Sequence, residues 1–573
     1  MRIPRHAANY ALLVALLAVL GLALLYPIAL TLRGAFYENT ARAEGFTLLN
    51  LRLIFEDPTL VGGLLNSLKV ACATTSLAML LALPLAVLSA RFSYPLKPLL
   101  NALILVPLIL PPFVGAIGFK MMWGRLGAIS TLTGLEFDLL GSAKFWGVVL
   151  VQSLNLYPII YLNASAALAN LDPALDEAAE NLGASWWRRF FTITLPLIRP
   201  GLFAGGTIVF IWSFTELGTP LVFDYAHVTP VQIFLGLKEV ESSAQPYALT
   251  LIMLVSAVSF YVLGKLVFGG RAHAMYAKAS RAGGEAPLSG PAAWGATGLF
   301  VLVCGASLLP HVGVMLTAFA APGSWYRSVL PQEWTLSHFQ QALGSDLASG
   351  SINNSLLLAS LAVAFDLFLG ILIGYLIVRT NIKGRGFLDA LCMLPLAVPG
   401  LVMAFGYVAM SLRWPFGREG PLGDVASVVA AEPRPMLFLV MAYAVRRLPY
   451  IVRATVAGLE QTSGQLEEAA LNLGASRFTA VRRVIVPLIA ANLIAGALLA
   501  FSFSMLEVSD SLILAQQERS YPITKAIFTF ANRLADGPYI ASAMGVWGML
   551  LLAVTLAGAS IMIGKKLGAI FRV

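Results

Sequence analysis

The sequence predicts an all-α integral membrane protein with about twelve transmembrane helices, arranged as two parallel six-helix repeats. Composition is the first observation: 58% of the 573 residues are hydrophobic, 12% are charged, and the mean hydropathy is +0.80. The second is a series of apolar runs of about 20 residues, each long enough to cross a hydrocarbon core as a helix. The third is an internal repeat of whole segments. This balance excludes a soluble globular protein. The membrane topology explains the net charge of +9, so no nucleic-acid partner is inferred from it.

The apolar runs predict the spans in chain order. They are apolar on all sides, whereas strands of a membrane barrel would alternate polar and apolar residues, so we expect helices. The runs begin near Tyr10, Leu64, Leu99, Phe145, Gly201, Ala248, Ala293, Ser355, Phe387, Pro435, Asn492 and Ile540.

The second half of the chain repeats the first. The segment DEAAENLGAS at 176–185 returns as EEAALNLGAS at 467–476, an offset of 291. Earlier in each half, the segment NSL at 66–68 returns at 354–356, an offset of 288. A length change of three residues between the third and fourth spans reconciles the two offsets. An even number of spans per half gives both copies the same orientation, related by a pseudo-two-fold axis along the membrane normal.

The predicted division of the chain is a first half at residues 1–270, a linker at 271–291 and a second half at 292–573. The linker is rich in Ala, Gly, Ser and basic residues, as expected of an exposed segment. With a cytoplasmic N-terminus, the segments that face the cytoplasm carry clusters of basic residues, as the positive-inside tendency requires. We therefore expect both termini and the linker in the cytoplasm.

Each half contains a polar loop between its fourth and fifth spans, at 172–200 and 460–491. The loop has the pattern E-A-A, three residues, Gly, nine residues, and an I-x-L-P-like ending. Glu and Ala favour a short helix, and the Gly is expected to end it by adopting a left-handed conformation. Small residues around this Gly leave a knob that a groove on another protein could accept. The motif residues are Glu177, Ala178, Ala179 and Gly183 in the first loop, and Glu468, Ala469, Ala470 and Gly474 in the second.

With these residues the chain resembles the inner-membrane permeases of bacterial ABC importers, whose signature is this loop. The resemblance covers essentially the full chain and implies the type I importer permease architecture, in the bacterial inner membrane. It implies that each loop is a coupling helix that docks on one of two copies of a cytoplasmic ATPase subunit. It also implies an external binding protein, periplasmic or lipid-anchored, that delivers the substrate.

The sequence contains no GxxxxGK[ST] stretch that could cradle nucleotide phosphates. We therefore expect no cofactor bound by this chain, with ATP and Mg used by the partner ATPase. The chain is expected to be a transport subunit and not an enzyme.

The fusion of two such halves most resembles the permeases of ferric-iron importers, which implies ferric iron as the substrate. Fused permeases of thiamine and 2-aminoethylphosphonate importers are similar, so both substrates stay open as alternatives. A secondary carrier driven by an ion gradient is the rival from another class, although it would have no reason to carry two such loops. A membrane-embedded enzyme is less favoured, because the five histidines show no metal-ligand spacing.

Polar residues inside the apolar runs are candidates for a translocation path, because they are costly in lipid and usually face a cavity or one another. Glu216 and Glu507 could form a carboxylate pair that attracts a hard cation, or each could pair with a basic residue or cap a helix. Arg446 and Arg447 would favour an anionic substrate, unless acidic residues of the chain neutralise them. Either Asp366 or Glu507 is expected to do so. The full set of candidates is Glu216, Glu507, Asp510, Asp366, Asn155, Arg446 and Arg447.

Overall fold

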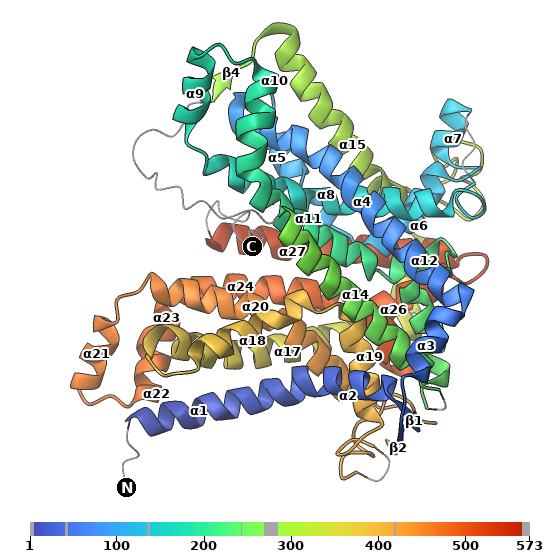
Figure 1. The fold of residues 1–573 in the computed structure, drawn as a ribbon. Helices are drawn as coiled ribbons and strands as arrows, with labels where there is room; N and C mark the ends of the chain where they lie inside the picture. Colours follow the sequence, from blue (N-terminus) through green and yellow to red (C-terminus); the bar gives the residue numbers. More distant parts are fainter. Residues whose placement is uncertain are drawn as a thin grey trace. The chain divides into compact units, whose positions relative to one another are not determined.

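The chain folds into two compact units, and each unit takes segments from both sequence halves. Unit 1 contains the described residues within 1–58, 232–254 and 336–567, and unit 2 contains those within 59–231 and 255–335. The predicted linker at 271–291 lies outside the described residues up to residue 284. The computed structural model describes residues 5–39, 44–134, 138–241, 243–268, 285–417 and 420–563, most of them helical (Figure 1).

Unit 1 combines the first span of the chain with five spans of the second half. The first span is one long helix interrupted by a π-helical turn, and it runs beside α17 and α18 (Figure 1). The strands β1 and β2 form an antiparallel pair in which Tyr37 faces Phe46. The elements are α1 (Arg5–Leu20), η1 (Gly21–Leu25), α2 (Tyr26–Ala35), β1 (Tyr37–Asn39), β2 (Glu44–Phe46), α3 (Leu49–Glu56), η4 (Leu237–Glu239), part of α14 (Gln245–Phe268), α16 (Ser337–Gly344), α17 (Asp346–Arg379), α18 (Arg385–Ala397), α19 (Gly400–Ser411), α20 (Met436–Glu460), α21 (Gln465–Asn472), α22 (Arg477–Ala480), η5 (Val481–Ile485), α23 (Val486–Leu488), α24 (Ala490–Met505), α25 (Ser509–Leu514), η6 (Glu518–Ser520), α26 (Ile523–Ala531) and α27 (Gly537–Ile563).

Unit 2 combines the remaining spans of the first half with the first span of the second half. Its core lies among α4, α8, α11 and α15, where Tyr157, Ile160 and Phe300 are fully buried. The strands β3 and β4 form a short parallel pair in which Phe92 faces Ala286. The elements are α4 (Pro58–Arg91), β3 (Phe92–Ser93), α5 (Lys97–Leu103), η2 (Val106–Ile109), α6 (Pro112–Trp123), α7 (Ala128–Thr133), α8 (Lys144–Ala169), α9 (Pro173–Asn181), α10 (Trp186–Arg189), η3 (Phe190–Thr194), α11 (Leu195–Phe214), α12 (Gly218–Val222), α13 (Thr229–Gly236, which continues into unit 1), the rest of α14, β4 (Ala286–Pro287) and α15 (Gly290–Phe319).

The two halves exchange their first spans through matched glycines. In unit 1, α2 packs against α19, where a Cβ on Gly406 would lie 2.9 Å from Pro27. In unit 2, α15 packs against α6, where a Cβ on Gly118 would overlap the backbone of Pro310. Gly118 and Gly406 are related by the offset of 288. Small residues let membrane helices approach closely, so one repeated position accommodates the exchanged span in both units.

The spans follow the predicted order, but the predicted number is not confirmed. Among the described residues, eight helices are long and apolar enough to cross a membrane, or up to eleven if each of three bent pairs is one span. The predicted third and ninth spans are pairs bent by 103°, and the predicted eleventh is bent by 77°. The predicted tenth span corresponds to α20. This helix is not among the eight, because Arg446, Arg447 and Arg453 make it too highly charged to count as an apolar span.

The predicted division into two halves and a linker stays a prediction, and the structure describes the end of the linker only from residue 285. The helix α15 begins at Gly290, before the predicted start of the second half at 292. Residues 286–287, predicted as linker, pair with β3 in unit 2. Pro291 fits the first turn of this helix, because its missing amide would have no partner there.

Candidate functional site

Both predicted loops fold as a short helix, a glycine turn and a second helical turn. In unit 2, α9 is followed by Gly183 with φ of +79°, and in unit 1, α21 is followed by Gly474 with φ of +89°. This region of backbone conformation favours glycine, because a Cβ would be strained there. The predicted left-handed glycines are therefore confirmed in both halves.

The helical turn after each glycine begins in the same way. The Ser185 hydroxyl accepts a hydrogen bond from the Arg188 amide at 3.5 Å, and the Ser476 hydroxyl accepts one from the Thr479 amide at 3.2 Å. These are N-cap contacts, which satisfy amides that the helix leaves unpaired. The matched π-helical segments η3 and η5 then lead into the fifth span of each half. The serine cap of the second helical turn is thus repeated in both loops, whereas the first helix is capped by the Asp172 side chain in α9 and begins at Gly464 without a side-chain cap in α21.

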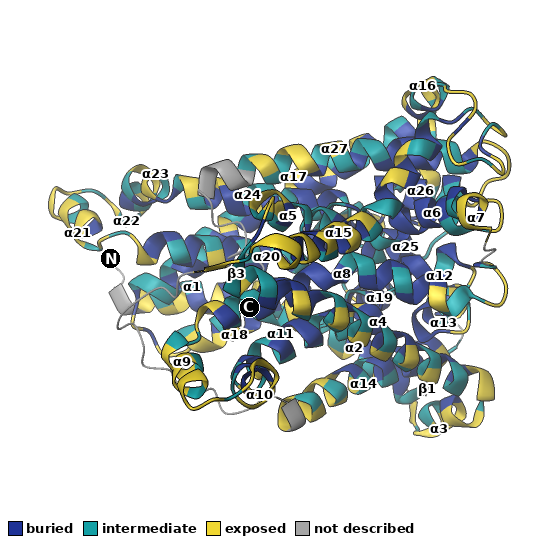
Figure 2. Ribbon diagram, turned by 90° about the horizontal axis from the view of Figure 1, so that it is seen from above, coloured by how far each residue is buried: buried dark blue, intermediate teal, exposed yellow. Residues whose placement is uncertain are grey.

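The loops present apolar tips to their surroundings. Leu182 is 89% exposed beside the first glycine, and Leu473 is 90% exposed beside the second. Trp187 and Phe478 follow at matched, exposed positions. Large apolar side chains at such exposure are typical of a protein contact surface. The helices α9 and α21 are largely exposed (Figure 2). Among the motif residues, Glu177, Ala178, Gly183, Glu468, Ala469 and Gly474 are exposed, and Ala179 and Ala470 are half-buried.

Sequence reasoning missed the residues that attach these loops to the rest of each unit. Asp176 in α9 pairs with Arg91, at the end of α4. Glu467 in α21 pairs with Arg379, at the end of α17. Arg91 matches Arg379 in the repeat, and Asp176 matches Glu467. A search for charged residues that recur at matched positions of the two halves could therefore have found both pairs.

The candidate path residues of the second half form a cluster of ion pairs. An Arg446 Nη1 atom lies 2.7 Å from Glu507 Oε1 and 3.2 Å from Asp510 Oδ2. Arg447 also donates to Glu507. Glu507 and Asp510 are buried, so both arginines are balanced by carboxylates within the unit. This geometry favours the interpretation in which Glu507 neutralises the arginines.

The candidate residues of the first half make local contacts instead. Glu216 accepts hydrogen bonds from the amide and the hydroxyl of Thr219, at 3.2 and 3.3 Å, at the start of α12. Asn155 donates to the carbonyls of Pro107 and Leu110, at 2.6 and 2.9 Å, where the chain bends between α5 and α6. Glu216 thus caps a helix, one of the two interpretations left open. The carboxylate pair of Glu216 with Glu507 stays a prediction, since these residues belong to different units.

Asp366 is a buried carboxylate in the middle of α17. Neither of its carboxylate oxygens has a hydrogen-bond partner among the described residues. The helix packs in parallel on α20, where Gly370 meets Ile451 and Gly374 meets Thr455. The same register brings Asp366 level with Arg447, but no ion pair joins them.

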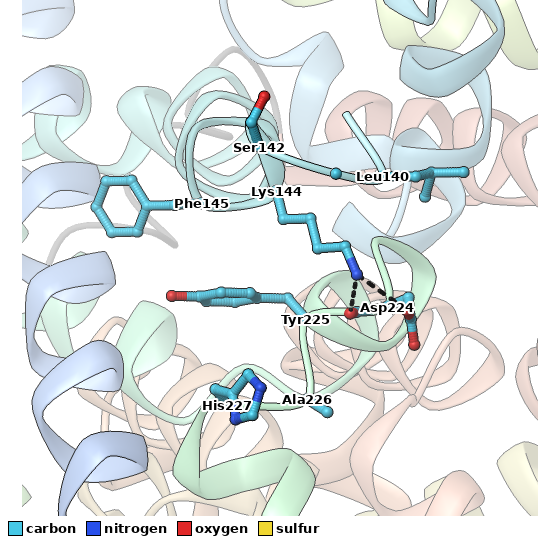
Figure 3. Close-up of a pocket in the computed structure, with 9 residues that line it drawn as sticks. Leu140, Ser142, Lys144, Phe145, Asp224, Tyr225, Ala226 and His227 are labelled. Atoms are coloured by element: carbon cyan, nitrogen blue, oxygen red, sulfur yellow. Dashed lines mark hydrogen bonds and ion pairs between the residues drawn. The ribbon is translucent and has the colours of Figure 1, made fainter. Parts of the chain in front are cut away.

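A cavity of about 490 Å³ opens in unit 2 between the start of α8 and the segment that joins α12 to α13 (Figure 3). Lys144 lines this cavity, and its Nζ atom lies 2.9 Å from Asp224 Oδ2. The ring of Tyr225 and the side chain of His227 lie along the same wall (Figure 3). Within the described ranges, no group of three or more His, Cys, Asp or Glu residues could hold a metal ion.

One protein family matches both halves of the chain. The family described as "Binding-protein-dependent transport system inner membrane component" matches residues 82–272 and again residues 366–561. Each match includes one of the two glycine loops and the spans on either side of it. The duplication inferred from the sequence therefore corresponds to two copies of one family domain.

Two curated relatives are ferric transport permeases. The "Ferric transport system permease protein FbpB" of Actinobacillus pleuropneumoniae is 26% identical over 470 residues, which are 79% of this chain and 64% of that protein. The "Putative ferric transport system permease protein FbpB 1" of Haemophilus influenzae is 26% identical over 429 residues, 72% of this chain and 63% of that protein. The chain thus spans less than two thirds of the length of both relatives.

A third relative matches only one half of the chain. The "Molybdenum transport system permease protein ModB" of Escherichia coli is 36% identical over 175 residues, which are 30% of this chain and 74% of that protein.

Proposed function

This chain belongs to the family of binding-protein-dependent transport system inner membrane components, and we propose that it is the permease of an ABC importer with both permease halves in one polypeptide. The observation that carries this proposal is the pair of glycine loops, which share a helix, a positive-φ glycine and a serine cap at matched positions. Two equal docking loops suit two copies of one ATPase. An ion-gradient carrier would have no use for them.

The proposed partners follow from the two kinds of surface that such a permease needs. The exposed tips at Leu182 and Leu473 would insert into grooves of two cytoplasmic ATPase subunits, which bind the ATP and Mg. A substrate-binding protein on the outer side would deliver the substrate. In this proposal both termini and both loops face the cytoplasm.

Vanadate tests the energy source directly. Proteoliposomes that contain the chain, its ATPase and its binding protein should take up substrate only when ATP is present on the side of the membrane that carries the ATPase. Vanadate should stop this uptake. Uptake that persists with vanadate and collapses when a proton or sodium gradient is removed would favour the secondary carrier.

Cysteine labelling tests the orientation. In a background without Cys72, Cys304 and Cys392, a cysteine at Ser463 should react only from the cytoplasmic side. A cysteine at Ser345 should react only from the outside. The opposite pattern would contradict docking of the loops on a cytoplasmic ATPase.

For the substrate we propose ferric iron, supported by the names of two relatives that share most of this chain. Arg446 and Arg447 are paired with Glu507 and Asp510, so their guanidinium groups are not free to bind an anionic substrate. This pairing is compatible with a cationic substrate. A phosphonate or another oxyanion would need such groups.

Competing substrates separate these possibilities. With the cognate binding protein present, vanadate-sensitive uptake of ferric iron should exceed uptake of molybdate, thiamine and 2-aminoethylphosphonate. Identification of the ligand that co-purifies with the binding protein provides a second, independent measurement. Uptake of one of the other three compounds without ferric uptake would replace ferric iron as the proposed substrate.

A further inference from the structure

Each coupling helix has almost no buried surface of its own. No residue of α9 is buried, and Glu467 is the only buried residue of α21. Apolar packing therefore cannot hold either helix in a fixed position on its unit. The acidic side chain in the first turn of each helix makes an ion pair with the end of a long helix, and in α9 a second acid, Glu180, pairs with Arg189 of the following turn.

In the first half, this contact joins α9 to the end of α4. Asp176 Oδ2 lies 3.3 Å from Arg91 Nη1, and the other terminal nitrogen of Arg91 donates to the Thr194 hydroxyl at 2.6 Å. Arg189, from the turn after the glycine, approaches the same carboxylate at 3.7 Å. Arg91 thus connects the last turn of a 34-residue helix with both sides of the loop.

In the second half, the matched contact joins α21 to the end of α17. Glu467 Oε2 lies 3.8 Å from Arg379 Nε, and the Tyr375 hydroxyl donates to Glu467 Oε1 at 2.6 Å. Arg379 also donates to the carbonyls of Leu459 and Thr462, at 3.0 and 2.8 Å. The arginine here fixes the end of α20 as well as the loop.

The two contacts share the ion pair and a threonine hydroxyl that accepts from the arginine, Thr194 in the first half and Thr462 in the second, and they differ in their other partners. Arg91 and Arg379 are related by the offset of 288, and Asp176 and Glu467 by the offset of 291. Beyond the threonine, Arg189 supports the first pair, whereas a tyrosine and two carbonyls support the second. An interaction that recurs while its surroundings differ is the common element of the two sites.

The ion pair also gives the loop a connection that the backbone does not provide. Along the chain, α9 follows α8 and precedes α10, and α21 follows α20 and precedes α22. The arginines add a link to α4 and α17, the two longest helices among the described residues. The basic end of one helix also faces the acidic first turn of the other, so both helix dipoles favour the contact.

We propose that Arg91 with Asp176, and Arg379 with Glu467, are positioning pairs that transmit movement of the coupling helices to α4 and α17. This inference rests on the proposed function, because it assumes that an ATPase moves the loops. Without the pairs, the loops would still dock and ATP would still be hydrolysed. The movement would no longer be passed fully to the two long helices, so less substrate would cross per ATP.

The test compares charge removal with charge retention at the same positions. The doubly neutralised variant, Asp176→Asn with Glu467→Gln, should assemble with the ATPase and hydrolyse ATP, while uptake per ATP falls about five- to tenfold. The charge-retaining variant, Asp176→Glu with Glu467→Asp, should keep uptake per ATP within about twofold of the unmodified protein. As a matched control, Glu56→Gln removes the exposed ion pair with Arg52, 2.6 Å away on α3, and should change nothing.

Two outcomes would overturn the inference. In one, the neutralised variant has normal uptake per ATP. In the other, uptake, ATP hydrolysis and protein level fall in parallel, as for a purely structural contact. Vanadate-sensitive uptake by the unmodified protein is measured in the same assay as the variants. If the unmodified protein shows no such uptake, the proposed function fails; if it does and the variants behave as above, only the positioning pairs fail.

Discussion

The two halves of the chain differ in charge at the bend of their third span. In the first half, the neutral amide of Asn155 holds the carbonyls of the bend between α5 and α6. At the matched position of the second half, Arg446 lies against Gly400 at the bend between α18 and α19, and it pairs with Glu507 and Asp510. One neutral side chain thus corresponds to part of a buried ionic cluster.

This difference shows what a duplicated membrane fold must keep and what it can change. The bend angles of the third span agree, at 103° in both halves, although the side chains beside them differ in charge. A buried polar group needs a partner close to it in space. At this bend, a neutral amide that binds carbonyls and a cluster of balanced charges both meet that need. The fifth span differs in shape as well: it is continuous over 186–214 in the first half and bent by 77° in the second.

The largest expected effect comes from opening the ionic cluster. Glu507→Gln leaves Arg446 and Arg447 short of one charge in a buried site, and should lower the free energy of unfolding by about 3 kcal/mol. The matched variant Glu216→Gln weakens a helix cap and should cost about 1 kcal/mol. Thermal unfolding of the two purified variants in detergent measures the difference. Equal losses would mean that the halves are energetically alike here.

The same two variants also test the cation interpretation. If Glu216 and Glu507 act together on one cation, the double variant should lose more uptake than the two single variants combined, at unchanged stability. We expect instead that the loss of uptake follows the loss of stability of Glu507→Gln.

A smaller effect is expected from pH at α26, which begins like α13 in the other half. The Thr229 amide donates to Ser67, and the Ile523 amide donates to Ser355, at 2.9 and 2.8 Å. Unlike α13, α26 carries Lys525, and burial lowers the pKa of this lysine to about 8.

Because the pKa of Lys525 is lower in the folded state, the unfolded chain binds more protons between about pH 8 and its ordinary pKa of 10.5. The free energy of unfolding should therefore rise across this window, by roughly 2 kcal/mol. Lys525→Met should flatten the rise when thermal midpoints are compared from pH 7 to 10. A rise of the same size in the variant would assign it to other groups.

A third comparison concerns the loop glycines, where the halves are expected to behave alike. Gly183→Val and Gly474→Val each place a β-branched side chain at positive φ, a strain of about 1–2 kcal/mol. Both variants should insert into the membrane and lose uptake to a similar degree. Gly62→Val in α4, where a Cβ meets nothing within 4 Å, is the control. A loss confined to one of the two loops would show that only that loop couples.

The smallest effect is expected at Asp366, whose matched residue in the first half is Ala78. Asp366→Ala removes a buried carboxylate without hydrogen bonds and should raise the free energy of unfolding by about 1 kcal/mol. Thermal unfolding and uptake are measured together. Loss of uptake at unchanged or higher stability would assign Asp366 a role in the path.

Much of the fold and part of the candidate site follow from the sequence alone. Hydropathy indicates the order of the spans, because crossing a hydrocarbon core requires a long apolar helix whatever its neighbours are. The run near Pro435 also predicts α20, although this helix carries three arginines, whose acidic partners lie elsewhere in the chain. The left-handed conformations of Gly183 and Gly474 were predictable, because a positive φ is a local property of glycine.

The sequence by itself determined the order of the membrane helices and the two glycine loops, since each depends on residues close together in the chain, and it determined the duplication, which is visible when the two halves are aligned. Only the tertiary structure decided that the halves exchange their first spans, that Glu507 pairs with two arginines, and that Asp176 and Glu467 attach the loops. These contacts join residues far apart in the sequence, and several partners of the right charge were available to each. Helix packing selects among them, because a buried charge takes the partner that the packed helices bring within reach.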